Sequence, residues 1–246
     1  MIILSWNVNG LRSIMRKGAL EKLLAAQPYD VVMLQEIRSS GDIPLTLMGL
    51  GYEAYPFPAE RKGYAGVMTL TKLHPISVIK GLGVRDFDSE GRTITLEFND
   101  FYLVNAYFPR AGDDLGRLDF KLSFCNTIEE FLNKLRLRKP VIICGDFNVA
   151  RDRIDSSFWD ENHPGLTPQE RNWLNHFLSL GYVDAFRELH PGLKLYTWRS
   201  YKERWRAMRI DYCIVSRELM SRVRRAEILT NIEGSDHVPI MVEIST

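Results

Sequence analysis

The chain has 246 residues, of which 45% are apolar and 26% are charged. These shares are typical of a globular protein and argue against disorder, collagen-like repeats and low-complexity scaffolds. Basic residues exceed acidic ones by only 32 − 31 = 1, so nucleic-acid binding would require local segregation of charge. No linker, repeat or composition shift marks a boundary, and we expect one domain over residues 1–246.

The cysteines and the apolar runs limit where the protein can work. Cys125, Cys144 and Cys213 are widely spaced and form no Cys-x-x-Cys pair, so we expect neither a disulfide framework nor a thiolate zinc site. No apolar run approaches the roughly 20 residues of a membrane-spanning helix, and no basic leader precedes the first apolar segment. We therefore expect a soluble protein in the reducing cytoplasm, with no membrane partner.

Short apolar segments alternate with amphipathic stretches along the chain, which predicts a mixed α/β protein. Three helices are predicted. The first covers 17–27 and is ended by Pro28, the second covers 115–137 and has a one-sided apolar stripe, and the third covers 168–180, where Thr167 and Glu170 fit a capping box. The stretch 150–166 has no clear assignment, and a loop of this length is often functional. Ten strands are predicted, too many for one simple three-layer sheet, at 2–8, 31–34, 66–71, 76–80, 92–98, 101–107, 141–144, 209–215, 223–229 and 238–244.

Polar residues interrupt or follow these strands at several widely separated places. Any one of them could be a turn or a cap, but strand ends are also where sheets display functional sites. Their repeated occurrence at strand ends predicts that some of them share a site. They are Asn7, Asn9, Gln35, Glu36, Asn105, Tyr107, Asp146, Asn148, Asp211, Asp236 and His237.

Convergence of these residues would create a strongly acidic pocket. Like charges in one pocket repel each other, and some carboxyl groups would stay protonated unless a cation were bound. Because oxygen ligands dominate among these residues, we expect a hard ion, Mg²⁺ with Mn²⁺ as a substitute. His237 follows an acid and could be held protonated, donating to a phosphate oxygen in the transition state. The acids concerned are Glu36, Asp146, Asp211 and Asp236.

Ten short motifs occur in a defined order along nearly the whole chain. They are SWNVNGLR at 5–12, LQE at 34–36, GYAGV at 63–67, EGR at 90–92, NAYFP at 105–109, CGDFN at 144–148, LTPQER at 166–171, YTW at 196–198, RIDY at 209–212 and GSDHVPI at 234–240. In this order they resemble the exonuclease III-type apurinic/apyrimidinic endonucleases of the endonuclease/exonuclease/phosphatase superfamily. The resemblance implies a four-layer α/β sandwich of the deoxyribonuclease I type, in which two mixed β-sheets pack face to face with helices outside.

The resemblance also implies an activity. It predicts a Mg²⁺-dependent repair enzyme that hydrolyses the phosphodiester 5′ to an abasic site in duplex DNA and leaves a 3′-hydroxyl. A 3′–5′ exonuclease is a candidate second activity in base-excision repair. The expected partner is duplex DNA containing an abasic site, bound by a monomer inside the cell.

Roles for individual residues follow from the same resemblance. The expected metal ligands are Glu36, Asp236 and Asn7, and Asn7 would also position Asp146. Asp146 would activate the attacking water. The remaining catalytic residues are Asn148 and His237, which would bind the scissile phosphate, Asp211, which would orient His237, and Tyr107, which would contact the phosphate or assist the leaving oxygen.

The sequence also contains a candidate DNA-binding segment. Between residues 199 and 225, nine basic residues face three acidic ones, an excess of 9 − 3 = +6, and aromatic residues are interleaved with them. Aromatic faces can stack on bases or sugars while Arg and Lys hold phosphates. Together with the family positions, this predicts a DNA-binding track made of Arg12, Lys17, Arg61, Tyr64, Arg110, Trp198, Arg199 and Lys202.

Several departures from the family pattern concern the choice of lesion. Arg199 stands where many relatives have a second aromatic residue, Arg110 stands where many have Asn, and the segment after Tyr201 is short. Two other functions stay open. One is a different phosphodiesterase or phosphatase of the superfamily, a non-specific DNase or a phosphoinositide or sphingomyelin hydrolase, because one catalytic set serves many substrates. The other is a catalytically inactive DNA-binding module, which the presence of every expected ligand disfavours.

Overall fold

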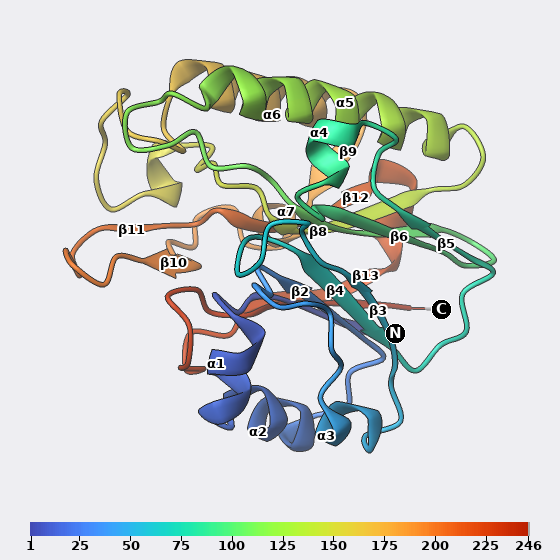
Figure 1. Ribbon diagram of the computed structural model, residues 1–246. Coiled ribbons are helices and arrows are strands. Elements are labelled where there is room, and N and C mark those ends of the chain that lie inside the picture. The colour runs from blue at the N-terminus through green and yellow to red at the C-terminus, as the bar shows by residue number, and fades with distance from the viewer. Residues whose placement is uncertain (246) are drawn as a thin grey trace.

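The protein, described here by a computed structural model of residues 1–245, is a sandwich of two six-stranded β-sheets. The two sheets pack face to face, and helices cover the outer face of each (Figure 1). This arrangement confirms the four-layer α/β sandwich that the resemblance implied.

The first sheet has the strand order β13-β14-β1-β2-β4-β3. β1 and β2 run parallel, whereas every other neighbouring pair is antiparallel. The parallel pair brings two carboxyl ends to the same edge, with Asn7 opposite Gln35. The strands are β1 (Ile2–Asn7), β2 (Val31–Gln35), β3 (Glu53–Phe57), β4 (Val67–Thr71), β13 (Val223–Ile228) and β14 (Ile240–Ile244).

The second sheet has the order β5-β6-β7-β8-β12-β9 and is mixed in the same way. β7 and β8 run parallel, with Tyr107 opposite Asp146, while β12 is antiparallel to β8 and sets Asp211 opposite Asp146. Register alone therefore places three predicted site residues side by side. The strands are β5 (Ser77–Lys80), β6 (Thr93–Glu97), β7 (Tyr102–Tyr107), β8 (Val141–Asp146), β9 (Tyr182–Asp184) and β12 (Asp211–Ser216).

The outer layers are helical (Figure 1). The first sheet is covered by α1 (Leu11–Arg16), α2 (Ala19–Ala26) and α3 (Leu45–Met48), and the second by α5 (Leu118–Arg136) and α6 (Pro168–Ser179). Short elements complete the fold, namely α4 (Arg85–Asp88), α7 (Ala185–Leu189) and the 3-10 turns η1 (Arg153–Asp155) and η2 (Arg217–Arg222). Within residues 1–245, no helix is long and apolar enough to span a bilayer.

Local sequence explains why these helices form where they do. On α5, apolar residues at spacings of three and four bury Phe124, Ile128 and Leu132 against the second sheet. α6 begins with the predicted capping box, in which the Thr167 hydroxyl oxygen accepts from the Glu170 N–H and the Glu170 carboxylate accepts from the Thr167 N–H.

Most sequence predictions of elements are confirmed, with a few instructive differences. All ten predicted strands exist, but β3, β9, β10 (Trp198–Arg199) and β11 (Ala207–Met208) were not predicted. β3 carries Pro56, which an edge strand tolerates, and the other three have two or three residues each. The predicted helix 17–27 begins only at Ala19, because Gly18 takes a left-handed conformation with φ of 64° and separates α1 from α2.

The prediction of no disulfide framework is contradicted by one bond. Cys144 on β8 and Cys213 on β12 form a disulfide, and Cys125 is free and buried. The two bonded residues are 69 positions apart in sequence, but the antiparallel register sets them directly opposite one another. Sequence spacing alone cannot reveal a pairing that depends on sheet topology.

Candidate active site

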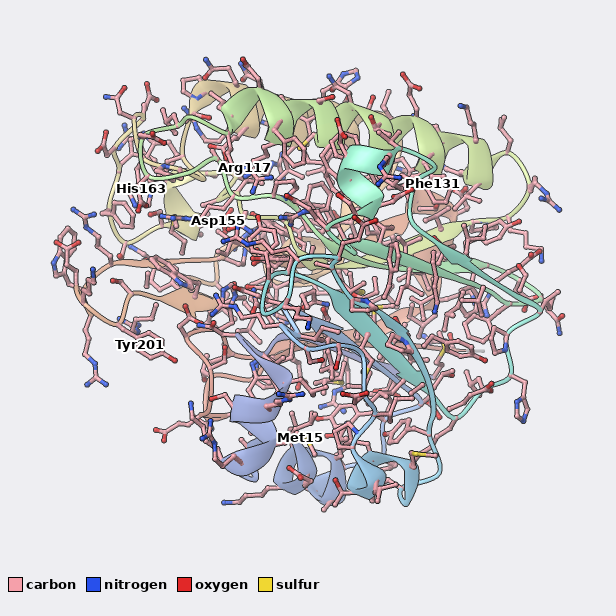
Figure 2. All side chains as sticks on the ribbon, viewed as in Figure 1. Met15, Arg117, Phe131, Asp155, His163 and Tyr201 are labelled. Carbon is pink, nitrogen blue, oxygen red and sulfur yellow. A yellow bond between two sulfur atoms is a disulfide. The ribbon has the colours of Figure 1, made fainter. Side chains whose placement is uncertain are left out.

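The predicted site residues come together at one end of the sandwich. Both sheets end there, beside α1 and the β10–β11 hairpin (Figure 1), and His163 and Tyr201 lie at the same end (Figure 2). A cavity of about 270 Å³ opens between the strand ends. Its lining residues are Asn9, Glu36, Arg38, Tyr107, Arg110, Asp146, Asn148, His163, Pro164, Trp198, Met208, Ile210, Asp236 and His237.

Asn7, the last residue of β1, links two of the acids. Its amide Nδ2 donates to Glu36 Oε2 at 3.0 Å and to Asp146 Oδ2 at 2.9 Å, and its Oδ1 accepts from the Asn9 N–H at 3.0 Å. The side chain is fully buried, so its hydrogen bonds hold both carboxylates in fixed positions. This geometry supports the positioning role expected for Asn7, while its role as a metal ligand stays a prediction.

Asp146 ends β8 and is the most perturbed acid of the site. It accepts hydrogen bonds from Asn7 and from the backbone N–H of Asn148, the latter at 2.8 Å. Burial and the charge of nearby Asp211 raise the pKa of Asp146, the charge of His237 and the hydrogen bonds from Asn7 and Asn148 lower it, and the resulting value is about 7. A carboxyl group with a pKa near neutrality can take up a proton during catalysis.

His237 lies between two carboxylates. Its Nδ1 is 2.8 Å from Asp211 Oδ2, and its Nε2 is 3.9 Å from Asp146 Oδ2. Burial would lower the pKa of His237, but the charges of Asp211 and Asp146 outweigh it and raise the value to about 10. The ring is therefore an imidazolium at neutral pH that donates through Nδ1 to Asp211, a contact that supports the orienting role we expect for Asp211.

Glu36 follows β2 directly and has a left-handed backbone with φ of 56°. Its Oε2 accepts from Asn7, and its Oε1 pairs with the guanidinium of Arg38, whose Nε lies 2.9 Å away. A non-glycine residue in this conformation is strained, and such strain is typical of functional positions. Arg38 was not predicted as a site residue, although its position two residues after Glu36 was a usable signal.

Asp236 is held by side chains from two other elements. Asn9 Nδ2 donates to Oδ1 at 2.9 Å, and the indole N–H of Trp198 donates to Oδ2 at 3.1 Å. Burial alone would raise the pKa of Asp236, but the charge of His237 and these hydrogen bonds lower it. Trp198, which was predicted to bind DNA, thus lines the cavity and also fixes an acid of the site.

Asn148 is hydrogen-bonded through its backbone to a buried lysine. Its backbone is left-handed, with φ of 52°, and its Nδ2 donates to the Phe108 carbonyl at 3.0 Å. The fully buried Lys121 of α5 donates through Nζ to the Asn148 carbonyl and pairs with Glu170. Lys121 was missed, although it lies on the apolar face of α5, where a lysine needs a buried partner.

Tyr107 ends β7 and stays protonated. Burial raises the pKa of its phenol well above the usual value, and the charge of Glu36 adds to the effect. The Arg92 guanidinium lies 4.8 Å from the centre of the ring and donates to the Tyr107 carbonyl at 2.9 Å. The phenol is therefore a fixed hydrogen-bond donor at the edge of the cavity.

The donor set of the site fits a divalent cation. Asp146, Asp211 and His237 offer ligand atoms that all lie within 4.8 Å of one another, a grouping that differs from the predicted ligands. His237 carries a proton, whereas Glu36 and Asp236 also line the cavity and supply further carboxylate oxygens. A hard cation would relieve the mutual repulsion of these acids, as the sequence predicted.

Comparison with known proteins agrees with this geometry. Residues 4–237 match the Endonuclease/Exonuclease/phosphatase family. The chain belongs to this family. An exodeoxyribonuclease of Bacillus subtilis is 37% identical over the full length of both chains, and a DNA-(apurinic or apyrimidinic site) endonuclease of Dictyostelium discoideum is 39% identical over 99% of this chain and 70% of its own.

Solved structures show the same family fold. A 3′ phosphatase from Neisseria bound to a product DNA hairpin superposes with a TM-score of 0.89 at 26% identity, and each chain is covered completely. An AP endonuclease from Archaeoglobus fulgidus gives the same TM-score, identity and coverage. The sandwich is therefore shared by family members whose names describe different reactions on DNA.

The residues expected to bind DNA are spread over the cavity and its surroundings and do not form a single patch. Arg110 lines the cavity itself, and Lys17 and Arg199 line a neighbouring one of about 420 Å³ that shares Asp236 with it. Arg61 and Tyr64 line a third cavity of about 440 Å³. Arg12 on α1 has an exposed side chain, and Lys202 is exposed in the loop between β10 and β11.

The basic segment between 199 and 225 does not form one charged surface as expected. Arg209 is buried, with Nε 2.7 Å from Asp155 Oδ1 and Nη2 2.7 Å from Asp184 Oδ2. Arg225 lies on β13, where it pairs with Glu227 and Glu243. Summing charge along the sequence overestimated the DNA-binding surface, because the chain turns into the core within the segment.

Proposed function

We propose that this family member is a Mg²⁺-dependent DNA-repair endonuclease that hydrolyses the phosphodiester 5′ to an abasic site and leaves a 3′-hydroxyl. The observation that carries the proposal is the position of Asp146, with its raised pKa, between Asn7 and the His237 imidazolium in a shared cavity. The names of the Bacillus and Dictyostelium relatives support DNA as the substrate. Trimming of 3′ ends is the second activity that we propose.

Asp146 is the group that activates water. With a pKa of about 7, it is partly ionised at neutral pH and can accept a proton from a water molecule in the cavity. The water oxygen then attacks phosphorus, and the bond from phosphorus to the 3′-oxygen of the preceding nucleotide breaks. Asn7 and the Asn148 N–H hold the carboxylate during this step.

The other polar groups stabilise the charge that develops on the phosphate. The protonated His237, kept in place by Asp211, is a donor that lines the cavity. Asn148 lines it too, and its amide, which donates to the Phe108 carbonyl and to Asp146 Oδ2, would turn to the phosphate when DNA binds. Tyr107 remains a neutral phenol and can donate to the phosphate or to the leaving 3′-oxygen. Such prearranged donors supply a large part of the barrier reduction in phosphoryl transfer.

Glu36 and Asp236, assisted by Asn7, are the residues that we expect to hold the cation. When bound, Mg²⁺ neutralises negative charge and polarises phosphate oxygens. Arg38 already neutralises one oxygen of Glu36, so the two carboxylates are not equivalent. Mn²⁺ prefers the same oxygen ligands and should substitute.

The biological setting is part of the proposal. An enzyme that acts on abasic sites must work where the DNA is, so we place the protein inside the cell, as a monomer acting on duplex DNA. Repair of abasic sites belongs to base-excision repair. Gel filtration with and without a short duplex would reveal a different oligomeric state.

The decisive test uses end-labelled duplexes that contain an abasic analogue, a uracil or no lesion, together with a duplex that ends in a 3′-phosphate. We expect incision 5′ to the abasic analogue in Mg²⁺, a 3′-hydroxyl on the product, and no incision in EDTA. Asp146→Asn serves as the inactive control.

Each other outcome favours a different function. Removal of the 3′-phosphate without incision of the abasic strand would make the 3′ end the principal substrate. Hydrolysis of phosphoinositide or sphingomyelin without DNA cleavage would support another phosphodiesterase of the superfamily. Binding of DNA without hydrolysis would support an inactive module.

A further inference from the structure

A row of aromatic rings leads from the cavity to the surface of the β10–β11 hairpin. His163 lines the cavity, and its ring centre lies 4.9 Å from that of Phe158. Phe158 in turn lies 6.0 Å from Trp205, and both contacts are edge-to-face. The row of His163, Phe158 and Trp205, called the aromatic track below, ends in a ring that is 59% exposed.

The aromatic track is held in place by hydrogen bonds and by one arginine. Ser157 Oγ donates to the Trp205 carbonyl at 2.7 Å and accepts from the Ala207 N–H at 2.8 Å, which fixes the two backbone segments that carry the rings. The guanidinium of Arg206 lies 5.1 Å from the centres of both Phe158 and Trp205. A ring that is fixed in advance loses little entropy when a ligand stacks on it.

The exposed end of the track lies in a loop with an excess of positive charge, in which Glu203 pairs with Arg206 at 3.1 Å. Arg204 and Arg206 flank Trp205, and Lys202 lies three residues before it, while Glu203 is the single acid in the loop 200–206. Aromatic faces set among basic side chains suit a nucleic-acid strand, since bases stack on the rings and phosphates meet the charges. Paired bases in a duplex are covered on both faces by their neighbours, so an unpaired base is the better ligand for such a surface.

We propose that the aromatic track binds unpaired nucleotides next to the phosphodiester in the cavity, so that substrates with a short single-stranded segment beside the scissile bond are preferred. The inference rests on the proposed function, because it takes the cavity to be the place where a DNA phosphodiester is held. It adds a substrate class, namely ends and lesions flanked by unpaired bases. Trp205 provides the outermost stacking surface.

The test compares two ligands on one protein. Asp146→Asn protein, used so that no cleavage occurs, is titrated with a fully paired abasic duplex and with the same duplex carrying three unpaired nucleotides 3′ or 5′ of the abasic analogue. Fluorescence anisotropy gives both dissociation constants. We expect one of the two unpaired arrangements to bind about tenfold more tightly than the paired duplex, as expected for stacking of about one base.

Variants on the hairpin identify the residue responsible. Trp205→Ala in the same background should abolish the tenfold ratio, and Trp205→Phe should retain most of it. Tyr201→Ala is the matched control, because Tyr201 lies in the same loop and is 63% exposed but makes none of the ring contacts of the track. It should change the binding of paired and unpaired ligands equally and leave the ratio unchanged.

A second readout reports stacking directly. 2-Aminopurine placed in the unpaired segment should be quenched on binding to the parent protein and not on binding to Trp205→Ala. Equal affinity for the paired duplex and both unpaired ligands, or a ratio that persists in Trp205→Ala protein with a normal melting temperature, would overturn the inference. Failure of the wild-type enzyme to incise abasic DNA is a separate result, which overturns the proposed function and not the ratio of affinities.

Discussion

Two clusters of buried charged residues are linked by the chain at Arg209 and Asp211, and they differ in the balance between acidic and basic side chains. In one cluster, the two carboxylates of Asp155 and Asp184 form ion pairs with the two guanidinium groups of Arg209 and Arg187. Burial alone would raise the pKa of Asp155, but the charges of Arg209 and Arg187 lower it. Burial alone would lower the pKa of Arg209, but the charges of Asp184 and Asp155 raise it. This balanced cluster ties the 150–166 segment to the end of β9, to α7 and to the short connection between β11 and β12.

The cluster at the cavity is unbalanced. Asp146 and Asp211 share a single buried cation, His237, and Glu36 and Asp236 add further negative charge. Burial and, after it, the charge of Asp211 raise the pKa of Asp146 to about 7, because His237 offsets them only in part. The comparison teaches that buried charge alone does not identify a functional site. Buried acids without enough counter-charge do, because they can bind a cation and take part in proton transfer.

The largest expected effect separates the two clusters by activity. Asp146→Asn should lower kcat about a thousandfold or more with little loss of DNA binding, since the variant keeps the shape but cannot accept the proton. Asp155→Asn, assayed at a temperature where it is folded, should keep near-normal kcat. Single-turnover cleavage of an abasic duplex measures both, and a near-normal Asp146→Asn rate would remove Asp146 from the role of base.

The second expected effect separates them by stability. Asp155→Asn should lower the free energy of unfolding by about 3 kcal/mol, because Arg209 and Arg187 lose a buried partner. Chemical denaturation measures the change. The control is Glu218→Gln, which removes the partner of Arg136 in a solvent-exposed pair and should cost less than about 1 kcal/mol.

The pH dependence of this stability difference has a definite sign. The folded pKa of Asp155 is lowered, so its contribution is complete above the unfolded pKa, near 3.9, and is lost as pH falls through the folded value. The difference between wild type and Asp155→Asn should therefore be constant above about pH 5 and shrink below about pH 4. A difference that grew on acidification would contradict the ion-pair account.

Lys121 pairs with Glu170 and also contacts Asn148 at the candidate site, so its substitution should lower both the folding stability and kcat, each by less than the substitutions above. Lys121→Met leaves Glu170 without its buried counter-charge, and we expect a loss of about 2 kcal/mol, since Glu170 keeps its hydrogen bonds to Thr167 and Gly165. Because the Asn148 carbonyl also loses a donor, kcat should fall by about tenfold. Unchanged kcat in a destabilised protein would limit Lys121 to a structural role.

The smallest expected effect concerns DNA affinity. Lys202→Ala should weaken binding to all duplexes and reduce the slope of log affinity against log salt by about one, because one phosphate contact is lost. Arg225→Ala, in the same basic stretch of sequence but paired with acids on β13, should leave the slope unchanged. Equal slopes for Lys202→Ala and wild type would place the DNA away from the hairpin.

Much of this architecture could be predicted from the sequence, because periodicity and motif order are local signals. The ten predicted strands exist, and Asn7, Asp146 and Tyr107 lie at strand ends, as expected. Parallel pairing of β1 with β2 and of β7 with β8 then brings these ends to one edge. The resemblance supplied the two-sheet arrangement, which the strand count alone did not specify.

What the sequence did not reveal depends on contacts between distant segments. The bond between Cys144 and Cys213 follows from the register of β8 and β12, and the burial of Arg209 follows from acids that lie far from it in sequence. Lys121 was missed for a related reason, since its partners Asn148 and Glu170 lie more than 25 residues away, whereas Arg38 was missed although its partner Glu36 is only two residues away. The net charge of a sequence segment is therefore a poor predictor of the net charge of a surface in the folded protein.

The central claim is that the unbalanced acids form a cation site and the balanced ones do not. Electron paramagnetic resonance of Mn²⁺ titrated into metal-free protein measures this directly, since bound Mn²⁺ loses the signal of the free ion. We expect Glu36→Gln to bind Mn²⁺ at least tenfold more weakly than wild type, and Asp155→Asn to bind it as wild type does. Equal binding by wild type and Glu36→Gln, or no binding by either, would contradict the account.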